Sequence, residues 1–269
     1  MKYKSIFLYI YFSLFMLSCT LVHNTSTIKD PPIKQFVKVY KNLEVTRCLK
    51  NANSSSEKTC ETRNMSSSGS GVFVDLVKDI PIVLTAGHVC DNLVKLPKDD
   101  GKYSFSIDAT VVVQNHKGKF YRTKTILSEH NSSPANINAA DLCTLLVFKS
   151  KDGSTGLKID SQEPKLGEFI YYMGAPMGIY HPPSMPIVGG YYSGKIDDLS
   201  SLTSAPASPG SSGSAVLSSR NKIYGVLFAV HPGFNTASVI TNHDKTKDFL
   251  KRTKILVENA KRRLQSDGT

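Results

Sequence analysis

The chain has 269 residues, of which 40% are hydrophobic and 20% charged, and its formal net charge is +11. This composition is ordinary for a globular protein and excludes intrinsic disorder, and the length allows one large domain or two small ones. The seven histidines are scattered without an HExxH pattern and no CxxC pair occurs, so we expect no metal site and no cofactor.

The first 22 residues have the pattern of an export signal. Lys2 and Lys4 form a charged start, and an uninterrupted apolar run of 18 residues follows from Ser5 to Val22. This length lies between that of a signal-peptide core and that of a membrane-spanning helix. The segment ending in Cys19 also resembles a bacterial lipoprotein processing box. Three alternatives remain: a cleaved signal peptide, an uncleaved membrane anchor, or a lipid on Cys19. In each, the protein is exported and its N-terminus is a candidate membrane tether.

Four cysteines remain in the exported part, namely Cys48, Cys60, Cys90 and Cys143. An even number of cysteines in an exported protein favours disulfide bonds, and four cysteines allow three pairings. We favour a bridge between Cys48 and Cys60, which would span a Ser-rich loop. Four separate buried thiols are the alternative.

Residues 23–35 form a polar, Pro-containing linker, after which the chain has the pattern of successive strands. FVKVY, starting at Phe36, alternates apolar and polar residues. The Ser-rich stretch NANSSSEKTCETRNMSSSGSG is predicted to be a loop before the second strand. Apolar, β-branched or aromatic runs then recur between turn signals: VFVDLV, IPIVLTA, YSFSIDATVVVQ, FYRTKTIL, LCTLLVF, FIYYMG, IVGGYYSGKI, SAVL, KIYGVLFAV and TASVIT. The sequence therefore predicts an all-β protein.

Residues 243–269 differ from the rest. From Asp244 to Leu264, apolar residues recur at helical spacing among Lys and Arg residues, which predicts a basic C-terminal helix. Its positive charge suggests attraction to an anionic membrane or to nucleic acid. We favour the simpler interpretation, in which the apolar stripe packs on the β-domain and the basic face lies in water. No nucleic-acid-binding module is visible, so we expect no nucleic-acid partner.

Three segments contain the residue types of nucleophilic catalysis. ASPGSSGSAV holds a Gly-x-Ser-Gly loop around Ser212, LTAGHVC places His88 after an apolar strand, and NAADLCTLLVF places Asp141 before another. A serine hydroxyl needs an imidazole to take its proton, and the imidazole needs a carboxylate to fix its tautomer and stabilise its charge. His88, Asp141 and Ser212 are therefore the candidate triad. A flexible Ser/Gly linker is the alternative for the serine loop.

A tetrahedral intermediate also needs two backbone N–H donors for its oxyanion, and glycines on both sides of a serine can aim them. The amides of Gly210 and Ser212 are the candidates.

These segments resemble the trypsin-like serine peptidases of the chymotrypsin fold, most closely the HtrA/Deg-type peptidase domains. His88, Asp141 and Ser212 occur in that family's order. GSGVFVD, DLCTLLV, the Gly-x-Pro-x-Gly pattern in YYMGAPMG and KIYGVLFAV extend the resemblance from about residue 68 to about residue 241. Ser211 departs from the Asp or Asn that is frequent there, and no PDZ-like segment follows.

The resemblance implies a peptidase domain over residues 33–242, made of two antiparallel β-barrels over about residues 33–155 and 156–242. The catalytic site would lie in the cleft between the barrels. Cys90 and Cys143 each lie two residues beyond a triad member, so contact between those members would bring the two cysteines together as a second disulfide.

The resemblance also implies where substrate binds. The base of the primary pocket would come from the segment ending at Pro206, and its wall from Leu227, Phe228 and Ala229, whose backbone would pair with the substrate as an added strand. No Asp stands in that base, so we expect small or medium apolar side chains before the cleaved bond rather than Lys or Arg.

Together these features predict a serine endopeptidase that cleaves proteins or peptides through an acyl-enzyme on Ser212. The alternatives are an esterase with the same triad, and a peptidase fold retained as a non-enzymatic peptide-binding or surface module.

Overall fold

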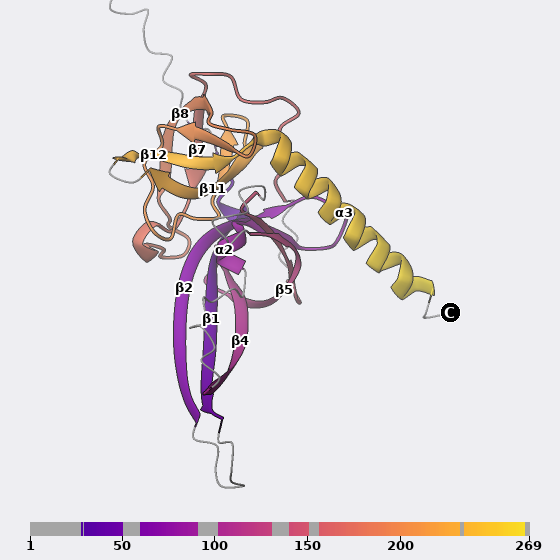
Figure 1. The fold of residues 1–269 in the computed structure, drawn as a ribbon. Coiled ribbons are helices and arrows are strands. Elements are labelled where there is room, and N and C mark those ends of the chain that lie inside the picture. Colours follow the sequence, from indigo (N-terminus) through magenta and orange to yellow (C-terminus); the bar gives the residue numbers. More distant parts are fainter. Residues whose placement is uncertain are drawn as a thin grey trace, which may run out of the picture.

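The computed structural model describes residues 28, 30–50, 60–90, 102–130, 140–150, 156–231 and 234–266. The signal or anchor expected over residues 1–22, with Cys19, lies outside the described residues, as does much of the linker. The described chain forms two closed barrels of six antiparallel strands each, followed by a long helix (Figure 1). The fold class predicted from the sequence is confirmed.

The first barrel follows a one-turn 3-10 helix, η1, at Ile33–Gln35. Its strands lie in the order β1-β2-β3-β6-β5-β4. Their bounds are β1 Phe36–Leu49, β2 Cys60–Val74, β3 Ile82–Thr85, β4 Tyr103–Asn115, β5 Phe120–Glu129 and β6 Leu142–Val147. A single helical turn, α2 at Gly87–Cys90, follows β3. All four residues of β3 are buried, as expected for an apolar run in a barrel wall.

The second barrel has the strand order β10-β11-β12-β9-β8-β7. Its strands are β7 Phe169–Met173, β8 Ile187–Lys195, β9 Ser200–Thr203, β10 Ala215–Ser218, β11 Ile223–His231 and β12 Phe234–Thr241, and a 3-10 turn, η2, lies at Pro176–Gly178. Strand β9 has the sequence SSLT and was not predicted. It forms because β8 and β12 pair with it on both sides, which outweighs its weak intrinsic preference.

The expectation of a loop up to residue 71 is wrong for its second half, because β2 already begins at Cys60. Residues Phe36 to Cys48 of β1 pair in register with Val72 to Cys60 of β2, so tertiary pairing overrides the loop preference of the serines. The two register partners Cys48 and Cys60 form a disulfide, one of the two bridges favoured from the sequence. With β4, these strands extend well beyond the rest of the barrel (Figure 1).

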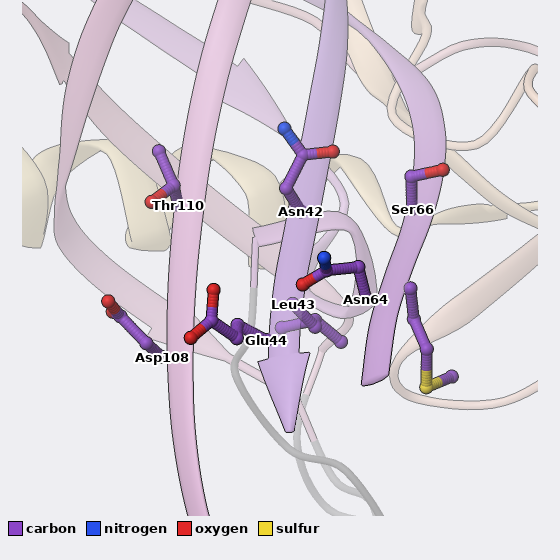
Figure 2. A pocket seen from close by; sticks show the side chains of 8 residues that line it. Asn42, Leu43, Glu44, Asn64, Ser66, Asp108 and Thr110 are labelled. Carbon is purple, nitrogen blue, oxygen red and sulfur yellow. The ribbon is translucent and has the colours of Figure 1, made fainter. Parts of the chain in front are cut away.

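This three-stranded extension has a polar, solvent-facing hollow of about 270 Å³. Figure 2 shows the side chains that rise around it from β1, β2 and β4. Strand register places them in two rows, Asn64–Glu44–Asp108 and Ser66–Asn42–Thr110. None of the candidate catalytic residues lines this hollow.

The C-terminal helix α3 runs from His243 to Ser266, close to the predicted bounds. Phe249 and Val257 are buried as the apolar stripe predicts, and they join a core cluster that contains residues of both barrels. Leu264 is 78% exposed, because the helix begins at the second barrel and its last turns run past the first (Figure 1). Among the described residues, no helix is long and apolar enough to cross a membrane.

Candidate active site

Strand register brings His88 and Asp141 together. Strands β3 and β6 are antiparallel with Thr85 opposite Cys143, so the chain just after β3 faces the chain just before β6. Asp141 Oδ1 accepts the backbone N–H of His88 at 2.7 Å, and Oδ2 lies 2.6 Å from His88 Nδ1. An ionised carboxylate makes Nδ1 the protonated donor, which leaves Nε2 as the proton acceptor. The pair has the arrangement that a general base requires.

A covalent bridge braces this pair. Cys90, at the end of α2, forms a disulfide with Cys143 of β6, across 53 residues of sequence. The bridge joins α2, which carries His88, to β6, which directly follows Asp141, and each cysteine lies two residues from its candidate triad member. The second disulfide expected from the sequence is thus present in the structure.

A second imidazole also contacts Asp141. His130, directly after β5, has its Nδ1 3.4 Å from Asp141 Oδ1, and its ring centroid lies 6.0 Å from that of His88. A Cβ atom on Gly87 would lie 2.7 Å from Asp141 Oδ1 and 2.9 Å from His130 Cβ. Only a glycine at this position lets the three groups converge. The sequence analysis did not single out His130.

The loop that carries Ser212 lies between β9 and β10, in the second barrel. Gly213 N–H donates to Leu227 O at 2.7 Å, and Leu227 N–H donates to Ser214 O at 2.9 Å. Gly213 has φ +90°, and a Cβ there would lie 2.1 Å from Ser70 O and 3.1 Å from Ala86 N. The loop therefore reaches across to the first barrel, against the residues that lead into α2 and His88.

Ser70 of β2 holds this loop in place and was missed in the sequence. Its N–H donates to Ser212 O at 2.8 Å, its Oγ donates to Gly210 O at 2.8 Å, and the same Oγ accepts Ala175 N–H at 2.9 Å. Ser70 is fully buried. A small hydroxyl residue between glycines, as in Gly-Ser-Gly before an apolar strand, is the signal that could have identified it.

The backbone amides of the loop divide into two groups. The N–H groups of Ser211, Gly213 and Ser214 are bonded within the protein. Among the hydrogen bonds of the described residues, none uses the N–H of Gly210 or of Ser212. Pro209 O accepts Met177 N–H at 2.6 Å, and because C=O and N–H point in opposite directions across a peptide, Gly210 N–H points away from that contact.

Ser212 itself is partly exposed, and its Oγ makes no hydrogen bond with any described residue. A hydroxyl that is neither buried nor committed to another partner is accessible to a ligand. His88 is also partly exposed, with 36% of its side-chain surface accessible.

The expected substrate-binding residues have different environments. Pro206 is exposed, and its carbonyl accepts the Tyr172 hydroxyl, whose pKa is raised by burial so that it stays protonated and donates. Phe228 and Ala229 are partly exposed. Leu227 is 1% exposed, and both of its backbone groups bind the Ser212 loop. Its backbone is therefore not free to pair with a substrate.

Three comparisons place these features among known proteins. Residues 69–226 match the family model of the trypsin-like peptidase domain. The inactive form of Rv3671c from M. tuberculosis aligns with TM-score 0.52 and 13% identity over 83% of this chain and 91% of that one. The active form of the Rv3671c protease gives 0.53 and 14% over 81% and 82%.

The serine endoprotease from Yersinia pestis aligns with TM-score 0.51 and 14% identity over 78% of this chain and 62% of that one. A search of curated proteins found no match to the sequence. At such low sequence identities, the structural similarities show the fold alone. The family model, in contrast, matches more than half of the chain. The chain belongs to the trypsin-like peptidase family and is a serine-type endopeptidase.

Proposed function

We propose that this endopeptidase cleaves peptide bonds through an acyl-enzyme on Ser212, with His88 as general base and Asp141 as its orienting carboxylate. The observation that carries the proposal is the Asp141 carboxylate, which fixes both the backbone and the ring of His88 beside the Ser212 loop. Such an arrangement leaves Nε2 available for the Ser212 proton.

In the first step, Ser212 Oγ attacks the substrate carbonyl carbon while its proton moves to His88 Nε2. The positive imidazolium is stabilised by Asp141, which remains ionised. The carbonyl π electrons form the oxyanion, and the N–H groups of Gly210 and Ser212, which no described residue accepts, supply the two donors it needs. Collapse of the intermediate breaks the C–N bond, and His88 returns the proton to the leaving amine.

Water then hydrolyses the acyl-enzyme by the same steps in reverse. His88 takes a proton from water, the resulting hydroxide attacks the acyl carbon, and Ser212 leaves with the proton that His88 returns. The products are two shorter peptides, and no other reactant is consumed.

For substrate binding we propose Pro206, Phe228 and Ala229, with Leu227 as a support of the Ser212 loop. Buried hydroxyls near the expected pocket base pair with each other, as Thr203 Oγ1 and Ser238 Oγ do at 2.9 Å. Ser238 Oγ also donates to Ala205 O at 2.8 Å. A base of small residues and paired hydroxyls supports a small or medium apolar side chain rather than a cation.

We also propose that the protein is exported and that residues 1–22 serve as signal, anchor or lipoprotein signal through Cys19. Two disulfides support an oxidising compartment. The substrates are then proteins or peptides outside the cytoplasm.

The test is covalent labelling of the purified full chain, in detergent, with a fluorophosphonate probe. We expect an adduct on Ser212 in the wild type and none in Ser212→Ala or His88→Ala, with mass mapping to separate Ser212 from Ser211. The rate should fall over the pH range in which imidazoles gain a proton. A folded wild type that does not react would instead favour a peptide-binding module that retains the fold.

A further inference from the structure

Asp141 faces two imidazoles, and the proposed mechanism uses only one. His130 Nδ1 lies 3.4 Å from the same oxygen, Oδ1, that accepts the His88 backbone N–H at 2.7 Å. Oδ2 faces His88 Nδ1. The carboxylate is thus approached from His88 on both oxygens and from His130 on one.

The position of His130 is built into the fold. Strands β5 and β6 pair with Glu129 opposite Leu142. The residue directly after β5, His130, therefore lies near the residue directly before β6, Asp141. Gly87 provides the space for His130, because a Cβ at Gly87 would lie 2.6 Å from Glu129 O and 2.9 Å from His130 Cβ. Strand register and one glycine therefore bring the second imidazole to the carboxylate.

The strand end before His130 is also anchored from outside the barrel. Glu129 forms an ion pair with Arg252 of α3, and Arg252 Nε donates to Asp248 at 2.8 Å. His130 itself retains 23% of its side-chain exposure, so it lies at the margin of the site rather than in the core.

The charged groups around the two imidazoles come from four elements. Asp141 precedes β6, Glu129 ends β5, Arg252 lies on α3 where it neutralises Glu129, and Lys41 of β1 donates its Nζ to His88 O at 2.8 Å. Asp141 is therefore the carboxylate that both imidazoles contact directly.

We propose that His130 is a positioning residue of the catalytic site: its ring, with Nδ1 3.4 Å from Asp141 Oδ1, gives the carboxylate a second polar contact and so helps to fix the group that orients His88. This inference rests on the function proposed above. A second polar contact limits rotation of the carboxylate, which keeps Oδ2 aligned with His88 Nδ1. The His130 ring can also gain a proton. The orientation of His88 then depends on pH through His130, in addition to the protonation of His88 itself.

Protonation of His130 has a defined consequence. It places a positive charge next to Asp141 Oδ1, which competes with the imidazolium of His88 for the same carboxylate. The protonated state is then a poorer catalyst even when His88 is still neutral. The acid limb of the rate profile should therefore reflect two imidazoles instead of one.

The experiment measures the second-order rate of fluorophosphonate labelling of the full chain from pH 5 to pH 9. His130→Asn keeps an N–H donor near the position of Nδ1 but cannot gain a proton in this range, and His130→Leu removes the donor at similar size. His181→Asn, at an exposed histidine between β7 and β8, is the matched control. Thermal unfolding of each variant checks that it is folded.

We expect His130→Leu to label about tenfold more slowly at pH 8, and His130→Asn to stay within about threefold of the wild type. The acid limb should become a single-proton step in His130→Asn and remain unchanged in His181→Asn. If His130→Leu fails to fold, the acid limb of the pH–rate profile of His130→Asn tests the proposal by itself.

A normal rate in His130→Leu, or an unaltered acid limb in His130→Asn, overturns the role of His130 while the wild type still labels at Ser212. Equal slowing in both His130 variants also overturns it, because it would indicate a packing role. A folded wild type without labelling overturns the proposed function and, with it, this inference.

Discussion

The two barrels hold their parts of the proposed site in different ways. In the first barrel, strand register, two hydrogen bonds and the Cys90–Cys143 bridge all hold His88 and Asp141 together. In the second, the Ser212 loop has no covalent brace and depends on glycine geometry and on hydrogen bonds to Ser70. Loss of the bridge in the first barrel should therefore reduce stability before activity, whereas single atoms that shape the Ser212 loop should decide activity.

The largest effect is expected for Gly213→Ala. A Cβ at Gly213 would lie 2.1 Å from Ser70 O and 2.2 Å from Thr85 Oγ1, and the residue has φ +90°. We expect labelling to fall by about 100-fold or more, because the oxyanion donors and Ser212 would both move.

Gly167→Ala is the control for Gly213→Ala. Gly167 has φ +78° but no heavy atom within 4 Å of the added Cβ, so it bears only the backbone cost of about 1 kcal/mol. Equal labelling rates in the two alanine variants would contradict the steric explanation.

Removal of the bridge beside the site should chiefly affect stability. The two bridges close loops with separations of 53 and 12 residues. From loop length, loss of Cys90–Cys143 should cost about 4 kcal/mol and loss of Cys48–Cys60 about 3 kcal/mol in the free energy of unfolding. Denaturant titration of the paired Cys→Ser variants measures both. Labelling should slow only in the variant that lacks the Cys90–Cys143 bridge. Slower labelling in the variant that lacks Cys48–Cys60 would link the three-stranded extension to the site.

Ser70→Ala should reduce activity at a smaller cost in stability. It leaves the carbonyl of Gly210 and the N–H of Ala175 without their buried partner, a loss of about 1–3 kcal/mol. We expect labelling to slow about tenfold. Ser104→Ala, at an exposed serine of β4, is the control, and a Ser70→Ala rate equal to that of Ser104→Ala would refute the support of the loop by the first barrel.

The smallest effect is expected at an ion pair that joins the segment before β7 to the turn between β10 and β11, where Asp160 and Arg220 lie. Burial by itself raises the pKa of Asp160, but the N–H of Gln162 and the Arg220 guanidinium outweigh it, so the pKa is lowered. A carboxyl with a lowered folded pKa contributes stability above its unfolded pKa, and this contribution is lost as the pH falls through the folded pKa.

Arg220→Gln should therefore lower the urea midpoint slightly at pH 7, with the difference closing in acid below the ordinary pKa of Asp. Labelling at Ser212 should not change. Arg63→Gln, which breaks the exposed pair with Glu61, is the control and should leave the midpoint unchanged. A difference between Arg220→Gln and wild type that persists in acid would argue against the ion pair as its cause.

Much of the fold could be predicted because a barrel strand needs an apolar run between turn signals, and runs such as IPIVLTA and KIYGVLFAV have that form. Strand β9 and the part of β2 from Cys60 to Gly71 could not, because their serines are held in strands by neighbouring chain segments rather than by their own preference. Pairing partners distant in sequence are not visible in a local pattern.

The same limit applies to the site. The Ser212, His88 and Asp141 segments have the composition of a triad, which local sequence can reveal. Ser70 and His130 act through contacts that exist only once β2 meets the Ser212 loop and β5 meets β6. The sequence also led to the expectation that the backbone of Leu227 pairs with substrate. In the structure, both backbone groups of Leu227 are bonded to the Ser212 loop, which sequence spacing does not reveal.

The helix α3 has a consequence for the order of events during synthesis. Its residues Phe249, Leu250 and Val257 belong to the core shared with the first barrel, and Thr253 Oγ1 lies 3.1 Å from Thr144 Oγ1 of β6. Because the ribosome makes the N-terminal strands first, the first barrel must wait for the helix before its core is complete. A nascent chain that lacks α3 therefore lacks the support behind β5 and β6, and proteolytic competence should arise late, after most of the polypeptide has been made.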